Sequence, residues 1–163
     1  MMQAGMFVPA QSFKASGCKG LFTHFKREED ASMTSGKLDE ELVRMRNVVQ
    51  QIRPGCLILF NESFAATNER EGSEISRQVI TAFLESDIRV ICVTHLFDLA
   101  HSFTNRSDTY FLRAERERTF QLVEGAPLPA SYGEDLYRTI FGTAPQSDGN
   151  ADTRQGERTP TAI

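Results

Sequence analysis

Apolar residues along the chain follow two patterns: short unbroken runs, and runs in which they recur every three or four residues. The unbroken run at residues 56–60 is too short for a helix and follows Pro54 and Gly55, so it predicts a fully buried strand. Similar runs predict strands at residues 20–25 and 88–94. The spaced runs predict one helix between the first two strands and a second helix at residues 72–85. Their inward positions are Leu38, Leu42, Met45, Val48, Val49 and Ile52 in the first helix and Ile75, Val79, Ala82 and Phe83 in the second.

The order of these elements predicts the fold class. A strand, a helix and a strand joined by short connections form a βαβ unit, which implies parallel strands. Three further elements follow: a short helix at residues 96–102, a hairpin of strands 109–114 and 119–123, and a last helix at 134–141. We therefore expect an α/β domain over residues 1–142, with a mostly parallel sheet, flanking helices and a C-terminal hairpin. Residues 143–163 are rich in Ser, Asp, Gly, Thr and Pro and lose the apolar period, which predicts a disordered tail.

Composition narrows the class of protein. The chain has 163 residues, 40% of them hydrophobic, and a net charge of −4. These values fit one domain with a real core and argue against a dedicated nucleic-acid-binding surface in this segment. The three cysteines, Cys18, Cys56 and Cys92, are too far apart for an ordinary zinc site or a disulfide framework. Cys56 and Cys92 lie in apolar runs, so we expect buried, reduced thiols in a cytoplasmic protein. No run is long enough to span a membrane.

The buried strand ends at two polar residues, Asn61 and Glu62. Open α/β sheets bind ligands at the carboxyl ends of their strands, and P-loop nucleotide hydrolases place a magnesium ligand and a general base there. Asn61 and Glu62 can also be the first residues of an ordinary loop, and this stretch alone leaves both interpretations open. The chain contains no G-x-x-x-x-G-K-[ST] phosphate loop, so these residues by themselves would lack a cradle for phosphate groups.

Several segments, in chain order, resemble the carboxy-terminal ATPase domain of the MutS family of DNA mismatch-repair proteins. They are residues 5–10, 22–24, 28–30, 35–36, 56–62, 93–99, 120–125 and 131–133. That domain is an ABC-type P-loop ATPase, which works as a dimer with two composite nucleotide sites. The resemblance covers residues 1–142 and implies that the chain begins just downstream of the phosphate loop.

The resemblance also implies roles for particular residues. Glu62 matches the acid that activates the attacking water, and His95 matches the histidine that contacts the terminal phosphate. Asn61 replaces the aspartate that helps to hold magnesium. An amide can bind Mg²⁺ through a water molecule but brings no negative charge, so we expect a weakened metal site. The alternative is that the metal is held by a threonine or serine of the absent phosphate loop. Ser35 and Gly36 match the signature segment that meets the nucleotide of the opposite subunit.

Other positions depart from the family pattern. Residues 63–68 take the place of the family's glycine-rich loop at the dimer interface, where Thr67 is kept but Phe64 and Ala66 replace two glycines. The segment after Gly36 lacks the family's Ser-Thr, so Ser35 as an ordinary helix cap remains an alternative. We interpret His24 and His101 as surface or structural residues.

The function implied by the resemblance is ATP binding and hydrolysis, with ATP and Mg²⁺ as cofactors, coupled to DNA binding in repair. The partners would be a second copy of the ATPase domain and mismatched or branched DNA, held by domains outside this chain, with no membrane. Without a phosphate loop, the chain alone should bind ATP poorly and hydrolyse almost none. The alternative is a catalytically degenerate module used for dimerisation or partner docking.

Overall fold

In a computed structural model of the chain, residues 6–26, 36–116, 119, 121–129 and 132–142 are described. The chain forms two units, Met1–Pro129 and Ala130–Ile163. The first unit contains a parallel sheet of β1 (Leu21–Phe25), β2 (Leu57–Asn61) and β3 (Arg89–Val93), in the order β1-β2-β3. The predicted βαβ unit with parallel strands is therefore confirmed. Because Phe25 pairs with Asn61 and Asn61 with Val93, all three strands end at the same edge.

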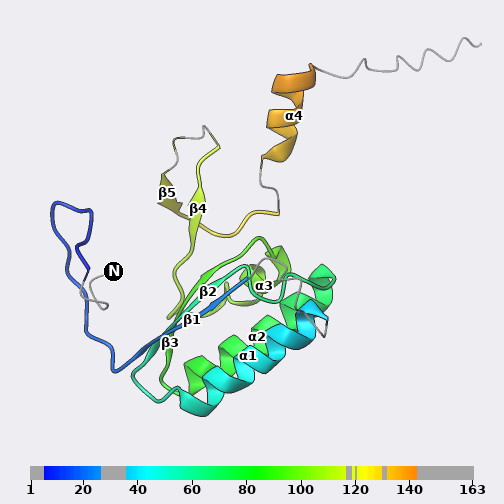
Figure 1. Cartoon of the computed structure of the whole chain (residues 1–163). Coiled ribbons are helices and arrows are strands. Elements are labelled where there is room, and N and C mark those ends of the chain that lie inside the picture. The colour runs from blue at the N-terminus through cyan, green and yellow to red at the C-terminus, as the bar shows by residue number, and fades with distance from the viewer. Residues whose placement is uncertain (1–5, 27–35, 117–118, 120, 130–131, 143–163) are drawn as a thin grey trace, which may run out of the picture. The chain divides into compact units, whose positions relative to one another are not determined.

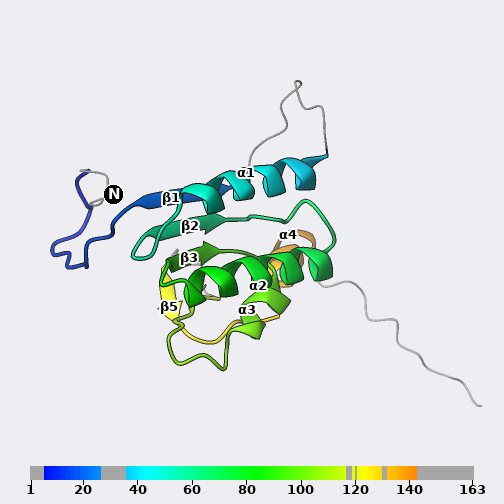
Figure 2. The ribbon, with the colours of Figure 1, turned by 90° about the horizontal axis from the view of Figure 1, so that it is seen from below.

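Helices α1 (Lys37–Gln51) and α2 (Glu69–Glu85) lie on the same side of this sheet, as Figures 1 and 2 show. Gly55 makes the turn between α1 and β2 with a φ of 82°, a left-handed conformation that glycine adopts without strain. Helix α2 begins three residues earlier than predicted, because the Asn68 side chain accepts a hydrogen bond from the Glu71 backbone N–H and caps the helix. The buried apolar core consists of Met45, Ile52, Cys56, Ile58, Phe60, Phe64, Ile80, Phe83, Ile88, Leu96, Leu99 and Phe103.

Parts of the predicted helix stripes were wrong. Leu42 and Val49 are exposed on α1, and Ala82 is exposed on α2. The buried side of α1 includes Glu41, and the buried side of α2 includes Ile80. A helix advances about 100° per residue, so a one-residue error in choosing the centre of the stripe exchanges covered and exposed positions.

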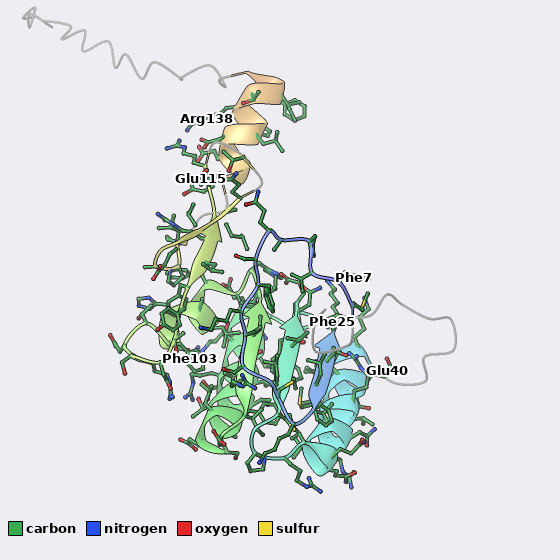
Figure 3. All side chains as sticks on the ribbon, turned by 90° about the vertical axis from the view of Figure 1, so that its left-hand side faces the viewer. Phe7, Phe25, Glu40, Phe103, Glu115 and Arg138 are labelled. Atoms are coloured by element: carbon green, nitrogen blue, oxygen red, sulfur yellow. The ribbon has the colours of Figure 1, made fainter. Side chains whose placement is uncertain are left out.

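The other face of the sheet is uncovered within the described part of the chain. Its exposed apolar side chains come from the two outer strands and are Leu21, Phe25, Ile91 and Val93. Figure 3 shows Phe25 at the carboxyl end of β1. The predicted burial of Cys92 was wrong: the residue is exposed, because no strand of the described residues pairs with the outer side of β3.

The remaining elements follow in the predicted order. Helix α3 (Phe97–Ser102) comes directly after β3, and β4 (Leu112–Ala114) and β5 (Leu122–Glu124) form the predicted antiparallel hairpin, with shorter strands than expected. The second unit contains α4 (Gly133–Phe141). The predicted tail, residues 143–163, lies outside the described residues. A search of the described residues finds no helix both long and apolar enough to cross a membrane.

Candidate functional site

The predicted polar pair lies at the carboxyl edge of the sheet. Asn61 is the last residue of β2 and is exposed, and its carbonyl oxygen accepts a hydrogen bond from the Lys26 backbone N–H at 2.9 Å. The Glu62 backbone N–H donates to the Val93 carbonyl oxygen at 2.9 Å. Glu62 has a φ of 53°, a left-handed conformation that non-glycine residues seldom adopt. The chain therefore turns sharply at Glu62 while its backbone stays attached to β3.

The end of β3 brings a second predicted residue to this edge. His95 lies between β3 and α3, where the Thr94 hydroxyl accepts a hydrogen bond from the Leu96 backbone N–H at 3.1 Å. Leu96 is only 3% exposed, so its side chain is anchored in the core and holds the backbone in place beside the exposed His95. The His95 Nδ1 forms a hydrogen bond with the Glu62 carboxylate Oε2. Glu62 and His95, which are 33 residues apart in the sequence, therefore form one pair.

This pair is open to solvent. The exposed fractions of the Glu62 and His95 side chains are 30% and 65%. The contact uses one carboxylate oxygen of Glu62, and the other, Oε1, has no hydrogen-bond partner within the described residues. A carboxylate oxygen in this state can accept a proton from a water molecule. When the His95 ring carries a proton on Nε2, that N–H can donate to an anionic oxygen.

The loop after Glu62 differs from an exposed glycine-rich loop. Phe64 is fully buried and has a φ of 59°, so phenylalanine here adopts the left-handed conformation that favours glycine. The Thr67 hydroxyl bonds to the Glu71 carboxylate, next to the Asn68 cap, so Thr67 is part of the start of α2. Its predicted contact with nucleotide stays a prediction.

The signature-like segment is described only in part. Ser35 lies outside the described residues. Gly36 is exposed and occupies the N-cap position of α1, with no side-chain hydrogen bond to the helix. The alternative that Ser35 caps the helix therefore also lies outside the described residues. No hydrogen bond between described residues joins Gly36 to the Glu62–His95 pair.

The donor atoms at this edge fit a hard cation weakly. Mg²⁺ prefers oxygen ligands and keeps several waters, and Asn61 and Glu62 supply amide and carboxylate oxygens at neighbouring positions. Within the described ranges, no three His, Cys, Asp or Glu side chains gather as a metal-holding group. One carboxylate and one neutral amide are too few ligands to hold Mg²⁺ alone. They could hold the ion through water molecules if a bound phosphate group supplied further ligands.

Two residues outside the predicted site support this edge: His24, whose interpretation as a structural residue is confirmed, and Glu41, which the sequence analysis did not single out. His24 is 1% exposed and Glu41 is 5% exposed, and both contact the loop behind Glu62. The signals were present in the sequence. His24 is two residues after Phe22, so both side chains lie on the same face of β1. Glu41 follows Leu38 by three residues and lies with it on the buried side of α1.

The chain is similar in sequence to known proteins. The family model for MutS domain V matches residues 1–124. An endonuclease MutS2 of Bacillus velezensis is 23% identical over 133 residues, which are 78% of this chain and 17% of the relative. The endonuclease MutS2 of Thermus thermophilus is 26% identical over 133 residues, again 78% of this chain and 18% of the relative. The chain thus spans less than a fifth of the length of these curated relatives. Because the family model covers most of its length, the chain belongs to the MutS domain V family.

Proposed function

We propose that the Glu62–His95 pair is the hydrolytic part of an ATP site, within a MutS-type ATPase whose nucleotide state is coupled to DNA binding in repair. The observation that carries this proposal is the contact between Glu62 and His95. The resemblance implies a general base at one position and a phosphate-contacting histidine at the other, and these roles require the two side chains to be neighbours. A parallel sheet that ends at one edge brings them together.

The chemistry follows from the two side chains. The oxygen of a water molecule forms a bond to the terminal phosphorus as the bond to the leaving oxygen of ADP breaks. Glu62 Oε1 accepts the proton that this water loses, and Oε2 keeps its hydrogen bond to His95. The Nε2–H of His95 donates to an oxygen of the transferred phosphoryl group. A bound Mg²⁺ neutralises phosphate charge, and Asn61 would hold it through a water molecule.

The proposal needs two parts that the 163 residues do not supply. One is a phosphate loop, which the resemblance places upstream in the reading frame. The other is a surface for mismatched or branched DNA, which we assign to other domains. A second copy of the ATPase domain completes each composite site. The names of the relatives describe endonucleases, and the Glu62–His95 pair by itself gives no reason to assign nuclease chemistry to this chain.

The test is ATP hydrolysis by the protein expressed from its complete reading frame. The Glu62→Gln variant keeps the shape of the side chain but removes the base, so kcat should fall by about 10²–10⁴-fold while bound nucleotide is retained. His101→Gln is the matched control, because His101 is exposed, stacks on Phe97 in α3 and forms no hydrogen bond with Glu62 or His95 among the described residues. Turnover equal to that of the wild type in Glu62→Gln would contradict the assignment of Glu62 as the general base.

A specific observation favours the rival, a degenerate module for dimerisation or partner docking. The Phe64 side chain fills the core at a loop position where the family has glycine, and Asn61 brings no charge to the metal side. The rival predicts no magnesium-dependent turnover in the wild-type protein and no change with Glu62→Gln. Reading the frame upstream of Met1 separates the two, since a phosphate loop within a few helical turns supports the ATPase and its absence supports the rival.

A further inference from the structure

The two residues after Glu62 turn into the core and meet polar side chains there. Ser63 is 6% exposed and Phe64 is fully buried. The buried polar residues of the described part of the chain are His24, Glu41, Ser63, Ser73 and Ser76. Three of these five gather around one turn, and together with Phe64 they form what we call the buried cluster (His24, Glu41, Ser63 and Phe64). Burial of polar groups is costly unless they are paired, so several paired polar groups around one turn indicate that they hold the turn in a specific position.

Ser63 is held by β1. Its hydroxyl donates to the carbonyl oxygen of His24 at 2.6 Å, and the His24 ring Nδ1 lies 2.8 Å from the same hydroxyl oxygen. The other ring nitrogen, Nε2, lies 3.1 Å from the carbonyl oxygen of Glu41. A carbonyl can only accept, so Nε2 donates to it, and Ser63 contacts both the backbone carbonyl and the ring of His24. His24 therefore links Ser63 to the second turn of α1.

Phe64 is held by α1. Its backbone N–H donates to the Glu41 carboxylate Oε2 at 3.0 Å, and its ring stacks on the His24 ring with centroids 5.2 Å apart. Burial raises the pKa of Glu41, while the Phe64 amide and then Arg44 act in the opposite direction. The Arg44 guanidinium donates to the carbonyl oxygen of Phe25 at 3.0 Å, so the same turn of α1 is also attached to the end of β1.

The turn needs this support because its backbone is unusual. Glu62 and Phe64 both have positive φ, and Ser63 lies between them. Non-glycine residues keep such conformations only where the surrounding structure holds them. Helix α2 closes the third side: a Cβ on Gly72 would lie 2.4 Å from the Phe64 carbonyl oxygen, so the two backbones are in close contact. The position of Glu62 is thus fixed from β1, α1 and α2 together.

From these contacts we infer that His24, Ser63 and Glu41 are positioning residues, which set the place of the Glu62 carboxylate by fixing the turn at residues 62–64. The consequence for regulation is that a displacement of α1 relative to β1 moves the candidate base. None of the three side chains forms a hydrogen bond with Glu62 or His95 within the described residues, so their effect passes through the backbone. The catalytic consequence rests on the proposed function, but the positioning itself does not.

Amide hydrogen exchange in the full chain, followed residue by residue by NMR, tests the positioning. Ser63→Ala removes the hydroxyl that joins the turn to β1, and exchange at the Glu62 and Phe64 amides should speed up about tenfold, the effect of losing one buried hydrogen bond. Ser76→Ala is the matched control: its hydroxyl is equally buried but has no hydrogen-bond partner in the described part of the chain. Equal exchange at residues 62 and 64 in the two variants would overturn the inference.

A second pair of variants keeps the inference testable if Ser63→Ala does not fold. Glu41→Gln retains an oxygen that can accept from the Phe64 N–H, so protection of that amide should remain. Glu41→Ala removes the acceptor, so protection should be lost. Loss in both variants, or in neither, would contradict the role of Glu41.

Turnover of the protein expressed from its complete reading frame gives the second readout. For Ser63→Ala we expect kcat to fall about tenfold with the KM for ATP unchanged, because the residue positions the base and does not touch nucleotide. Ser76→Ala should match the wild type. A wild-type protein without turnover would refute the proposed function and leave exchange to decide the positioning. A lowered kcat in Ser63→Ala without faster amide exchange at residues 62 and 64 would contradict the inference that Ser63 acts on Glu62 by fixing the backbone of the turn.

Discussion

The two sides of residues 61–64 differ in what surrounds them. Asn61 is exposed and the side chain of Glu62 is 30% exposed, whereas Ser63 is 6% exposed and Phe64 is fully buried. The open side contacts His95 and solvent, and the buried side contacts a histidine ring and a carboxylate in the core. This difference separates two tasks within four residues. The buried side holds the backbone in place, and the open side presents the Glu62–His95 pair on which the proposed chemistry rests.

The largest expected effect is that of Phe64→Ala on stability. The change removes a fully buried ring that packs against His24, so the free energy of unfolding should fall by about 3–5 kcal/mol. Chemical denaturation of the full chain measures it. Phe7→Ala is the control, because Phe7 is 97% exposed and should cost almost nothing. A small, equal loss in both variants would show that the buried side does not supply stability.

The next effect is that of Gly72→Ala. The added Cβ would lie 2.4 Å from the Phe64 carbonyl oxygen, and backbone must move to relieve the contact. We expect the free energy of unfolding to fall by about 1–3 kcal/mol, as for other overpacked sites. Gly17→Ala serves as the control, since nothing lies within 4 Å of a Cβ at that position. If the two glycine variants were equally stable, α2 would not close the turn as described.

A pH-dependent effect should distinguish Glu41→Gln from the wild type. Burial raises the pKa of Glu41 above its ordinary value of 4.5. The folded state therefore holds this proton more tightly than the unfolded state, so wild-type stability falls as pH rises through the raised pKa. Glutamine does not titrate, so the stability of the Glu41→Gln variant does not fall with pH at this position. Denaturation from about pH 4 to about pH 8 should show its free energy of unfolding rising relative to the wild type. A relative change in the opposite direction would contradict the prediction.

The smallest expected effect on stability is that of His95→Ala on the open side. Its contact with Glu62 is open to solvent, and solvent-exposed contacts of this kind contribute about 0–1 kcal/mol. The melting temperature of the full chain should therefore stay close to that of the wild type and depend little on salt. A loss as large as that of Phe64→Ala would mean that the Glu62–His95 pair is part of the core.

Much of the fold could be predicted because it depends on local patterns. The run from Cys56 to Phe60 is the predicted strand, but only Cys56, Ile58 and Phe60 are buried, while Leu57 and Leu59 are half-buried, so the prediction of a fully buried strand was wrong on one face. The spacing of Met45 and Ile52 indicates their burial, and the βαβ order implies the parallel sheet. The contact of Glu62 with His95 also follows from strand order. For His24 the sequence left surface and structural roles open, and Glu41 was not singled out, because a polar residue becomes a core residue only when a partner from another element satisfies it. The effects of Asn61, Ser35 and Thr67 on nucleotide binding stay predictions.

The central claim is that residues 61–64 carry chemistry on one side and stability on the other. The most direct test measures turnover and the free energy of unfolding together for Glu62→Gln, with the wild type alongside. We predict that kcat for ATP falls by about 10²–10⁴-fold while the free energy of unfolding changes by less than about 1 kcal/mol. Turnover equal to that of the wild type, or a loss of stability comparable to that of Phe64→Ala, would contradict the claim.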